Sequence, residues 1–234
     1  MNSTIITIDG PAGSGKSTVS RMLALKINFL YLDTGAMYRA VALASKRQGI
    51  DPGDEKRLGE LCKSLDLHFN TGEGSPRLFL GNEDISTAIR GPEMDMLASE
   101  ISAAREVREA MVSLQRKMGE GTNLIAEGRD MGTVVFPEAG RKFFLTASHE
   151  TRADRRYKER LERGESVSRD RVEAELRKRD HQDETRSLSP LRPAKDAIII
   201  DSTGLTPEEV VEEIRCQLAG SQNSKGFPLT DLLN

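Results

Sequence analysis

A glycine-rich motif close to the amino terminus sharply restricts the folds that this chain can adopt. Residues 10–17 read Gly-Pro-Ala-Gly-Ser-Gly-Lys-Ser, which fits the pattern G-x-x-x-x-G-K-[ST] at every fixed position. The apolar, β-branched run Thr4–Asp9 predicts a short buried strand before the motif, and Ser17–Asn28 predicts a helix after it. A glycine-rich loop in this setting turns its backbone N–H groups inward around phosphate oxygens. We therefore predict a nucleotide-binding α/β fold.

Two side chains of this motif have predicted chemical roles. Lys16 is expected to span the β- and γ-phosphates of a bound nucleotide, and Ser17 is expected to bind Mg²⁺. The alternative, a structural glycine turn, is disfavoured because the flanking strand and helix match as well as the spacing. The motif alone does not separate a kinase from a GTPase switch or an ATP-driven machine.

Further apolar runs next to helical patterns predict the rest of a doubly wound parallel sheet. A second helix is predicted over Ala36–Arg47. The remaining strands are predicted at Phe29–Asp33, Asn123–Glu127, Lys142–Ala147 and Ala197–Asp201. The expected fold class is therefore an α/β three-layer sandwich around a five-stranded parallel sheet.

The middle of the chain has a different pattern. Leu65–Asn70 and Arg77–Leu80 alternate with period two and predict a hairpin. The loop between them contains Thr71, Gly72, Gly74 and Pro76. We interpret residues 58–97 as a small inserted subdomain and expect Glu93–Gly119 to be helical.

The carboxyl-terminal third is predicted to be mainly helical. Glu150–Asp183 reads as two helices broken near Gly164. Thr206-Pro207-Glu208-Glu209 is a capping box with proline at the first helical position, so it predicts the start of a last helix. After Gly220 the pattern fades, and a mobile tail is expected.

Composition disfavours several functional classes. The net charge of −3 and the aromatic content of 4% argue against a nucleic-acid-binding protein. The two cysteines, Cys62 and Cys216, match no metal-ligand spacing and are too few for a disulfide scaffold, which favours the cytoplasm. No apolar run approaches the ~20 residues of a membrane helix, and no basic residue precedes the first apolar stretch as in a secretion signal.

A GTPase is disfavoured as well. The chain has no N-K-x-D segment to recognise guanine. The sequence Asp201-Ser-Thr-Gly204 imitates a D-x-x-G switch, but it follows the last predicted strand and is best interpreted as a turn.

Two polar clusters at predicted strand ends indicate a second, anionic substrate. Asp33–Arg39 follows the second strand, where Thr34 is expected to cap the next helix, and Glu127–Asp130 ends another strand. Either cluster alone would fit a surface turn equally well. Both are expected at the sheet edge that carries the glycine-rich loop, where open α/β sheets bind ligands.

Arginines form two further patterns on predicted helices. Arg152, Arg156, Arg160 and Arg163 form one stripe of like charges, which would be stabilised by an anion. Interleaved acidic residues leave a solvated face as an equal alternative. Arg179, Asp183 and Arg186 also share one face, and an ordinary salt-bridge chain is their alternative reading.

Taken together, these segments resemble the bacterial cytidylate kinases, a branch of the nucleoside monophosphate kinases. The matching segments are IDGPAGSGKST (8–18), YLDTGAMYR (31–39), GRDMGTVVFPEA (128–139), RKRD with the following D and R (177–186), and IIIDST (198–203). The likeness covers about residues 3–219. It departs mildly at Thr34, where serine is frequent, and at Glu127, where aspartate also occurs.

The resemblance implies a core, a monophosphate-binding domain and a lid. The implied divisions are 1–57 (core), 58–97 (inserted monophosphate-binding part), 98–149 (helices returning to the core), 150–186 (lid and following helix), 187–219 (core) and 220–234 (tail). The implied ATP-binding residues are Gly10, Pro11, Ala12, Gly13, Ser14, Gly15, Lys16, Ser17, Thr18 and Arg156. The implied acceptor-binding residues are Thr34, Arg39, Ser99, Arg108, Arg129, Asp130, Arg179, Asp183 and Arg186. Of these two sets, Lys16, Arg39, Arg129 and Arg186 are the expected catalytic residues and Ser17 the expected metal ligand.

The implied reaction moves the γ-phosphoryl group of ATP to CMP or dCMP, with Mg²⁺. A phosphate acceptor is already anionic, so arginines suffice and no strong general base is needed. Asp130 is expected to accept from the cytosine amino group, with Arg108 and Ser99 as donors, so that CMP is preferred over UMP. A kinase with another small acceptor, using Asp33 or Asp130 as base, and a non-catalytic nucleotide-binding switch remain the alternatives. We expect a cytoplasmic monomer that binds neither nucleic acid nor membrane.

Overall fold

A five-stranded parallel sheet forms the middle layer of the computed structural model, which describes residues 3–70 and 76–220. The strands lie in the order β2-β6-β1-β7-β8, and every neighbouring pair is parallel. Their bounds are Ile5–Asp9 (β1), Leu30–Asp33 (β2), Leu124–Gly128 (β6), Arg141–Thr146 (β7) and Ile198–Asp201 (β8). The predicted five-stranded parallel sheet is therefore confirmed, each strand lying within about two residues of its expected run.

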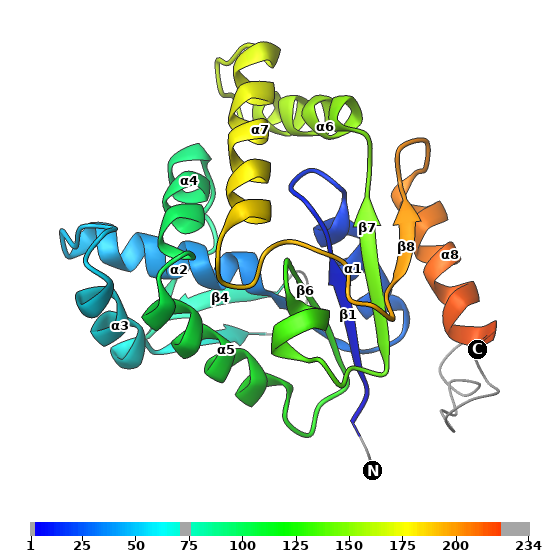
Figure 1. Cartoon of the computed structure of the whole chain (residues 1–234), viewed down its shortest axis with the longest axis horizontal. Helices are drawn as coiled ribbons and strands as arrows, with labels where there is room; N and C mark the ends of the chain where they lie inside the picture. Colours follow the sequence, from blue (N-terminus) through cyan, green and yellow to red (C-terminus); the bar gives the residue numbers. More distant parts are fainter. Residues whose placement is uncertain (1–2, 71–75, 221–234) are drawn as a thin grey trace.

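Helices cover both faces of this sheet (Figure 1). Apolar residues of α1 (Lys16–Lys26) and α8 (Pro207–Gly220) pack with Ile6 and Ile8 of β1 on one face. On the other face, α2 (Thr34–Arg47) and α5 (Arg105–Gly119) pack with Leu124 of β6. Successive strand residues point to opposite faces, so these β-branched and apolar runs fill two cores at once. The three-layer sandwich is confirmed.

The insertion folds against the second of these cores. It consists of α3 (Glu55–Ser64), β3 (Leu67–Asn70), β4 (Arg77–Leu80), β5 (Glu83–Asp84) and α4 (Pro92–Ile101). The antiparallel hairpin β3–β4 is confirmed, while the structure adds β5 at its edge and a helix, α3, that the sequence analysis did not predict. The expected boundary at residue 58 falls inside α3, and the hairpin loop residues Thr71, Gly72 and Gly74 lie outside the described residues.

The helical stretch predicted over Glu93–Gly119 divides into α4 and α5. The N–H groups of Ala103 and Ala104 donate to carbonyls only three residues back, Glu100 and Ile101, which ends α4 in a tight turn. The chain leaves this turn in a new direction, so the two helices present different side chains to one cavity. The helical periodicity of the sequence continues across this turn, so the sequence predicted one helix where the structure has two.

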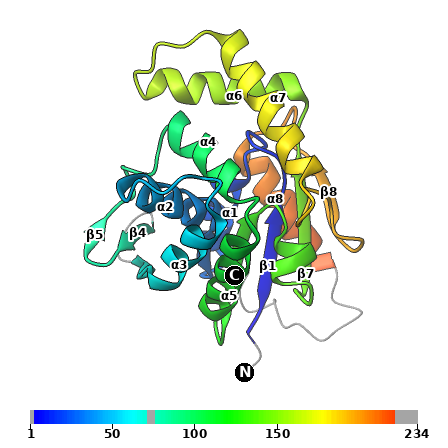
Figure 2. The same ribbon diagram turned by 60° about the vertical axis from the view of Figure 1, so that its left-hand side comes forward.

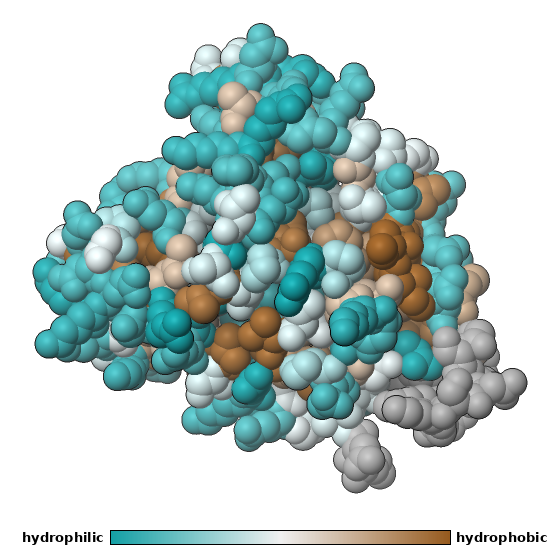
Figure 3. All heavy atoms as spheres, viewed as in Figure 1, coloured by the Kyte–Doolittle hydropathy of each residue, from teal (hydrophilic) through white to brown (hydrophobic). Residues whose placement is uncertain are grey.

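Two helices, α6 (His149–Glu162) and α7 (Arg169–Thr185), arch over the carboxyl ends of the strands (Figures 1 and 2). The predicted break near Gly164 is confirmed, and this glycine has φ +78°. Ala153 and Leu176 form a small apolar cluster with Ala12 of the glycine-rich loop. In the view of Figure 3, the surface of this pair is mostly hydrophilic.

The last helix begins as its sequence predicts. The N–H of Thr206 donates to Glu209 Oε2 at 2.8 Å, and the N–H of Glu209 donates to Thr206 Oγ1 at 3.3 Å. This reciprocal pair is the capping box. Among the helices of residues 3–70 and 76–220, none combines the length and the apolar character needed to cross a bilayer.

Candidate active site

The glycine-rich loop joins β1 to α1 and lies beneath the arch of α6 and α7. Gly13 has φ +75°, and a Cβ there would lie 2.9 Å from the backbone oxygen of Arg152 on α6. Only glycine permits both this left-handed backbone and this close approach to the helix above. The positive φ in the loop and the close contact with α6 therefore both require glycine at position 13.

Lys16 is the first residue of α1 and is buried. Its Nζ donates to the carbonyl oxygen of Pro11 at 3.0 Å. Burial, followed by the nearby Arg129, lowers the pKa of Lys16 to about 7. Such a lysine gains strongly when a polyanion enters, because the phosphates supply the negative charge that its surroundings lack.

The end of β2 and the start of α2 form the near wall of the site. Asp33, and not Thr34 as expected, is the N-cap of α2, since its Oδ1 accepts from the N–H of Ala36 at 2.8 Å. The expectation for Thr34 is wrong because that residue is already the first residue of the helix. Its hydroxyl donates instead to the carbonyl oxygen of Glu127 at 2.6 Å, which ties α2 to the end of β6.

Glu127 supplies a buried carboxylate beside the loop. The hydroxyl of Tyr31 donates to its Oε1 at 2.5 Å, while Oε2 is buried with no hydrogen-bond partner. Burial, followed by the charge of Asp33, raises the pKa of Glu127. An unpartnered buried carboxylate oxygen near a second carboxylate and near Ser17 fits a divalent cation. Within the described residues no group of three or more His, Cys, Asp or Glu could hold a metal ion, so phosphate and water would have to complete its coordination.

The segment after β6 carries the second expected cluster. Arg129 Nε donates to Asp183 Oδ2 of α7 at 2.7 Å. Asp9, at the end of β1, accepts from the N–H groups of Met131 and Gly132 at 2.9 and 2.8 Å. These residues open a short π-helical turn, Met131–Val135, which directs the preceding residues of the segment into the cavity. Burial raises the pKa of Asp9 to about 6 even though both backbone bonds lower it.

The three residues expected to recognise a base lie around one corner of the cavity. Arg108 of α5 forms an ion pair with Asp130 and donates to the carbonyl oxygen of Ser102 at 3.2 Å. Its guanidinium carbon lies 5.8 Å from the ring centre of Tyr38. Ser99 of α4 is hydrogen-bonded to Gln182 of α7 at 3.3 Å. Donors and an acceptor therefore face one corner between α4, α5 and α7.

A carboxylate that the sequence analysis missed lies among the arginines. Asp95 of α4 is ion-paired with Arg39 at 3.6 Å, with Arg179 at 3.8 Å and with Arg156. In the sequence, Asp95 reads as an acidic residue in the first turn of a helix, where it would complement the helix dipole. No signal in the sequence indicates its position in the cleft. Arg186, the remaining expected arginine, donates to the carbonyl oxygen of Ser189 at 2.7 Å.

The arginine stripe on α6 is only partly exposed to the cavity. Arg156 and Arg163 line it, as the anion-binding reading expects. Arg152 and Arg160 do not: Arg152 pairs with Asp180 at 2.7 Å, and Arg160 pairs with two glutamates at 2.6 and 2.7 Å. Those two positions turn toward α7 because the packing of α6 on α7 buries that side of the helix. They are structural, and the anion-binding reading is wrong for them.

Arg155, which the sequence analysis did not single out, anchors α6 to the sheet. It donates to Ser202 Oγ at 3.0 Å and to the carbonyl oxygen of Ser202 at 2.6 Å. The turn that imitates a switch motif thus serves as a docking point for α6. In the sequence, Arg155 lies between the positions of the arginine stripe, and its local pattern does not predict this contact.

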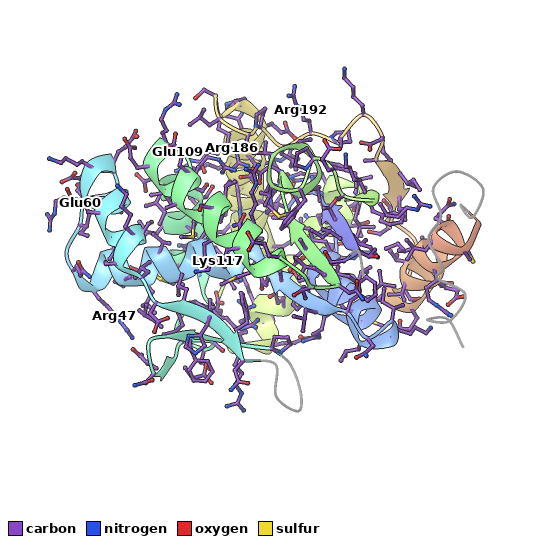
Figure 4. The ribbon with its side chains drawn as sticks, turned by 90° about the horizontal axis from the view of Figure 1, so that it is seen from below. Arg47, Glu60, Glu109, Lys117, Arg186 and Arg192 are labelled. Carbon is purple, nitrogen blue, oxygen red and sulfur yellow. The ribbon has the colours of Figure 1, made fainter. Side chains whose placement is uncertain are left out.

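One cavity of about 610 Å³ collects most of the expected site. Its lining includes Ala12, Gly13, Ser14, Gly15, Lys16, Ser17, Thr18, Thr34, Arg39, Ser99, Arg108, Arg129, Asp130, Arg156, Arg179, Asp183 and Arg186. Gly10 and Pro11 support the loop from outside this lining. Figure 4 shows Arg186 toward the middle of the molecule, whereas Arg47 and Glu60 lie at its rim.

Solved structures of other proteins share this fold. An uncharacterised protein from Eubacterium ventriosum matches with a TM-score of 0.53 at 13% identity, covering 94% of this chain and 99% of that one. A gluconokinase from Sinorhizobium meliloti matches with a TM-score of 0.51 at 14% identity, covering 93% of this chain and 92% of that one. These likenesses support the fold alone.

The sequence relatives are much closer. The cytidylate kinase from Citrifermentans bemidjiense is 48% identical over 90% of this chain and 91% of the relative. Those from Caldanaerobacter subterraneus and Enterococcus faecalis are 49% and 44% identical, covering 94% and 98% of this chain and 96% and 100% of the relatives. A model of the family described as cytidylate kinase matches residues 6–219. With its phosphate-binding loop and its arginine-rich acceptor side in one cavity, this chain belongs to the cytidylate kinase family.

Proposed function

We propose that the chain transfers the γ-phosphoryl group of ATP to CMP or dCMP, forming ADP and CDP or dCDP. The observation that carries this proposal is one cavity whose lining includes Lys16 together with Arg39, Arg129 and Arg186. Family membership gives ATP as the donor and a nucleoside monophosphate as the acceptor.

On the donor side, the loop binds the triphosphate through its backbone N–H groups and the start of α1. Lys16 lines the same cavity and would neutralise charge that builds up between the β- and γ-phosphates. Arg156 approaches from α6 and closes the donor site from above. These groups stabilise the transition state by position and charge, without covalent chemistry.

On the acceptor side, the attacking oxygen belongs to a phosphate. It is already anionic near neutral pH, so the site must hold two polyanions in line and does not have to remove a proton. Arg39, Arg129 and Arg186 provide that positive charge from three separate elements. Asp183 orients Arg129 through its 2.7 Å ion pair, and the resemblance assigns it to the ribose side of the acceptor.

The base is selected at the corner formed by Ser99, Arg108 and Asp130. The Asp130 carboxylate accepts from the 4-amino group of cytosine, and Arg108 with Ser99 donates to the ring acceptors. Uracil presents a carbonyl in place of that amino group and would leave Asp130 facing an acceptor. This costs about 1–3 kcal/mol, or roughly 5- to 150-fold in kcat/KM.

The buried edge of the loop fits Mg²⁺. Ser17, Asp33 and the unpartnered Oε2 of Glu127 would hold the ion directly or through water. When bound, the ion draws charge from the phosphate oxygens. Ser17 and Glu127 contribute by keeping their oxygens directed into the cavity, with Tyr31 holding the other Glu127 oxygen in place.

The different parts of the chain together exclude water from the reaction. Residues 150–186 act as a lid, and residues 58–97 act with the helices of residues 98–149 as the monophosphate-binding part. Residues 1–57 and 187–219 form the core. Closure keeps water from the activated γ-phosphoryl group and prevents wasteful hydrolysis. We expect a monomer that works in the cytoplasm, and sedimentation at micromolar concentration tests the first of these two points.

An acceptor panel tests the proposed activity. ADP formation from ATP is measured with CMP, dCMP, UMP, AMP and cytidine. We expect rapid turnover with CMP and dCMP, and kcat/KM for UMP lower by about tenfold or more. Cytidine, which offers only hydroxyl groups, should be inert. Turnover that ignores CMP, or that prefers cytidine, would replace this function with one of the alternatives.

Lys16→Ala tests the donor side of the site. The substitution removes the charge at the phosphates and should reduce kcat by two or more orders of magnitude, about 3 kcal/mol or more of transition-state stabilisation. Circular dichroism checks that the variant is folded. Near-normal turnover in folded Lys16→Ala would remove the basis of the donor-site assignment.

A further inference from the structure

One carboxylate lies in the part of the cavity where positive charge is concentrated. Asp95 occupies the first turn of α4 and is only 9% exposed. Its Oδ1 lies 3.6 Å from Arg39 Nη1 and 3.8 Å from Arg179 Nη1, and its Oδ2 contacts Arg156 Nη2. These three arginines come from three elements, α2, α7 and α6. In the proposed function, which this inference deepens, Arg39 and Arg156 bind phosphate, and Arg179 belongs to the implied acceptor-binding set.

The surrounding arginines keep the carboxylate of Asp95 ionised in this position. Burial raises its pKa, but Arg179, Arg156 and Arg39 together outweigh that effect, so the pKa lies below its usual value. Asp95 is therefore a permanent anion on the surface that phosphates must reach. Asp183 is likewise kept ionised beside Arg129, but Asp95 differs from it in pairing with arginines of α2, α6 and α7.

A carboxylate and a phosphate compete for the same guanidinium donors. Arg156 already uses its fork on Asp95 and on Glu159, the latter at 2.6 Å. A nucleotide that recruits Arg156 and Arg179 has to replace these bonds, and its phosphates then lie near a buried negative charge. In both respects Asp95 lowers the net affinity for nucleotides.

Asp95 also connects two parts of the molecule. It belongs to α4, on the monophosphate side, while Arg156 belongs to α6 of the lid, directly above α4 in Figure 2. The ion pair holds the lid over the cavity, and phosphates that take over Arg156 would then hold the lid themselves. As the products leave, Arg156 pairs with Asp95 again.

From these contacts we propose that Asp95 is a positioning residue that competes with nucleotide phosphates for Arg39, Arg156 and Arg179, and thereby weakens nucleotide binding and speeds product release. Its carboxylate occupies the arginine donors that a nucleotide phosphate would otherwise bind. The chemical class that it competes with is any polyphosphate or phosphate monoester that reaches the cavity.

Asp95→Asn tests this competition, because it keeps the size of the side chain and removes the charge. Binding of ADP and of inorganic tripolyphosphate is measured by calorimetry in the full-length protein. We expect both to bind about tenfold more tightly than to the unmodified chain. In steady-state assays KM for CMP and for ATP should fall, and kcat should fall as well, because product release becomes slower.

Two variants serve as controls. Asp95→Glu retains the charge and should stay within about threefold of the unmodified chain in both binding and KM. Glu93→Gln lies on the same helix but pairs with Lys46 at the exposed surface, at 2.6 Å, and should change neither quantity. The stabilisation by ADP in thermal unfolding should be larger for Asp95→Asn than for either control. Should Asp95→Asn not fold, Asp95→Ser takes its place with the same expectations.

Unchanged or weaker tripolyphosphate binding in folded Asp95→Asn or Asp95→Ser would overturn the proposal, and so would equally tight binding in Asp95→Glu. The tripolyphosphate measurement needs no acceptor and no turnover. If the unmodified chain binds it but does not phosphorylate CMP, the proposed function fails while the comparison at Asp95 still decides this inference.

Discussion

At the scale of single residues, the site contains buried charged groups that are only partly neutralised or hydrogen-bonded by their neighbours. Lys16 is surrounded by Arg129 and Arg179 as well as by Glu127 and Asp183, and burial together with Arg129 brings its pKa to about 7. Glu127 retains one buried oxygen without a partner. Groups arranged in this way gain more from a bound polyphosphate and cation than fully paired groups would.

This arrangement predicts that ATP binding is linked to proton uptake. Phosphates raise the pKa of Lys16, so binding between pH 8 and 9, where Lys16 is largely neutral, should take up close to one proton. Affinity for ATP should consequently fall as pH rises above about 7. Calorimetry in buffers with different ionisation enthalpies measures the uptake, and Lys16→Met should abolish it. Equal proton uptake by the two proteins would contradict the assignment to Lys16.

At the scale of elements, the backbone of the glycine-rich loop packs closely against the backbone and the Cβ of Arg152 on α6. A Cβ at Gly13 would lie 3.0 Å from the Cβ of Arg152, in addition to its contact with the carbonyl oxygen. Arg152 in turn donates to the carbonyl oxygen of Ala12 at 3.2 Å and pairs with Asp180 of α7. Arg152 thus links the loop to both α6 and α7, which explains why it is structural.

Gly13→Ala tests this packing against Gly49→Ala as a matched control. Both glycines have positive φ, +75° and +60°, but the space around Gly49 is open. Backbone strain alone should cost each variant about 1–2 kcal/mol of unfolding free energy. Gly13→Ala should lose roughly another 1 kcal/mol and most of its kinase activity, because α6 must shift. Urea unfolding and initial rates measure the two effects, and full activity in Gly13→Ala would contradict the packing argument.

At the scale of the whole molecule, the sheet and the lid are stabilised by different forces. The sheet lies between two apolar cores that include Ile6, Leu23 and Phe143 on one face and Met37 and Met111 on the other. The lid buries few apolar side chains, among them Ala153, Val172 and Leu176, and many of its contacts are ion pairs and hydrogen bonds. Apolar cores resist local opening better than solvent-accessible ion pairs do.

Hydrogen exchange should therefore separate the two regions. Amides of α6 and α7, residues 149–185, should exchange faster than those of β1 and β6, and added salt should widen the difference. A non-hydrolysable ATP analogue together with CMP should slow exchange in α6 and α7 and leave the strands unchanged. Equal protection with and without both nucleotides would argue against a lid that closes on its substrates.

Local patterns in the sequence determined the parts of this protein whose physics is local. The buried strand, the glycine-rich turn and the helix start that follow one another in residues 4–28 need no distant partner to be recognised. The break at Gly164 and the capping box at Thr206 are equally local, since one depends on φ and the other on hydrogen bonds within one turn. The resemblance to a known family then placed Arg39, Arg129 and Asp130 on one side of the cavity.

Only the tertiary structure decided which charges meet. Arg152 and Arg156 are equivalent in the periodicity of α6, yet one is buried against α7 and the other faces Asp95. Asp95 itself lies 61 residues from Arg156 in the sequence, and their contact exists because α4 and α6 are brought together by the packing of the insertion and the lid. Ion pairs between distant elements depend on the relative placement of whole helices, and no pattern within one helix encodes that placement.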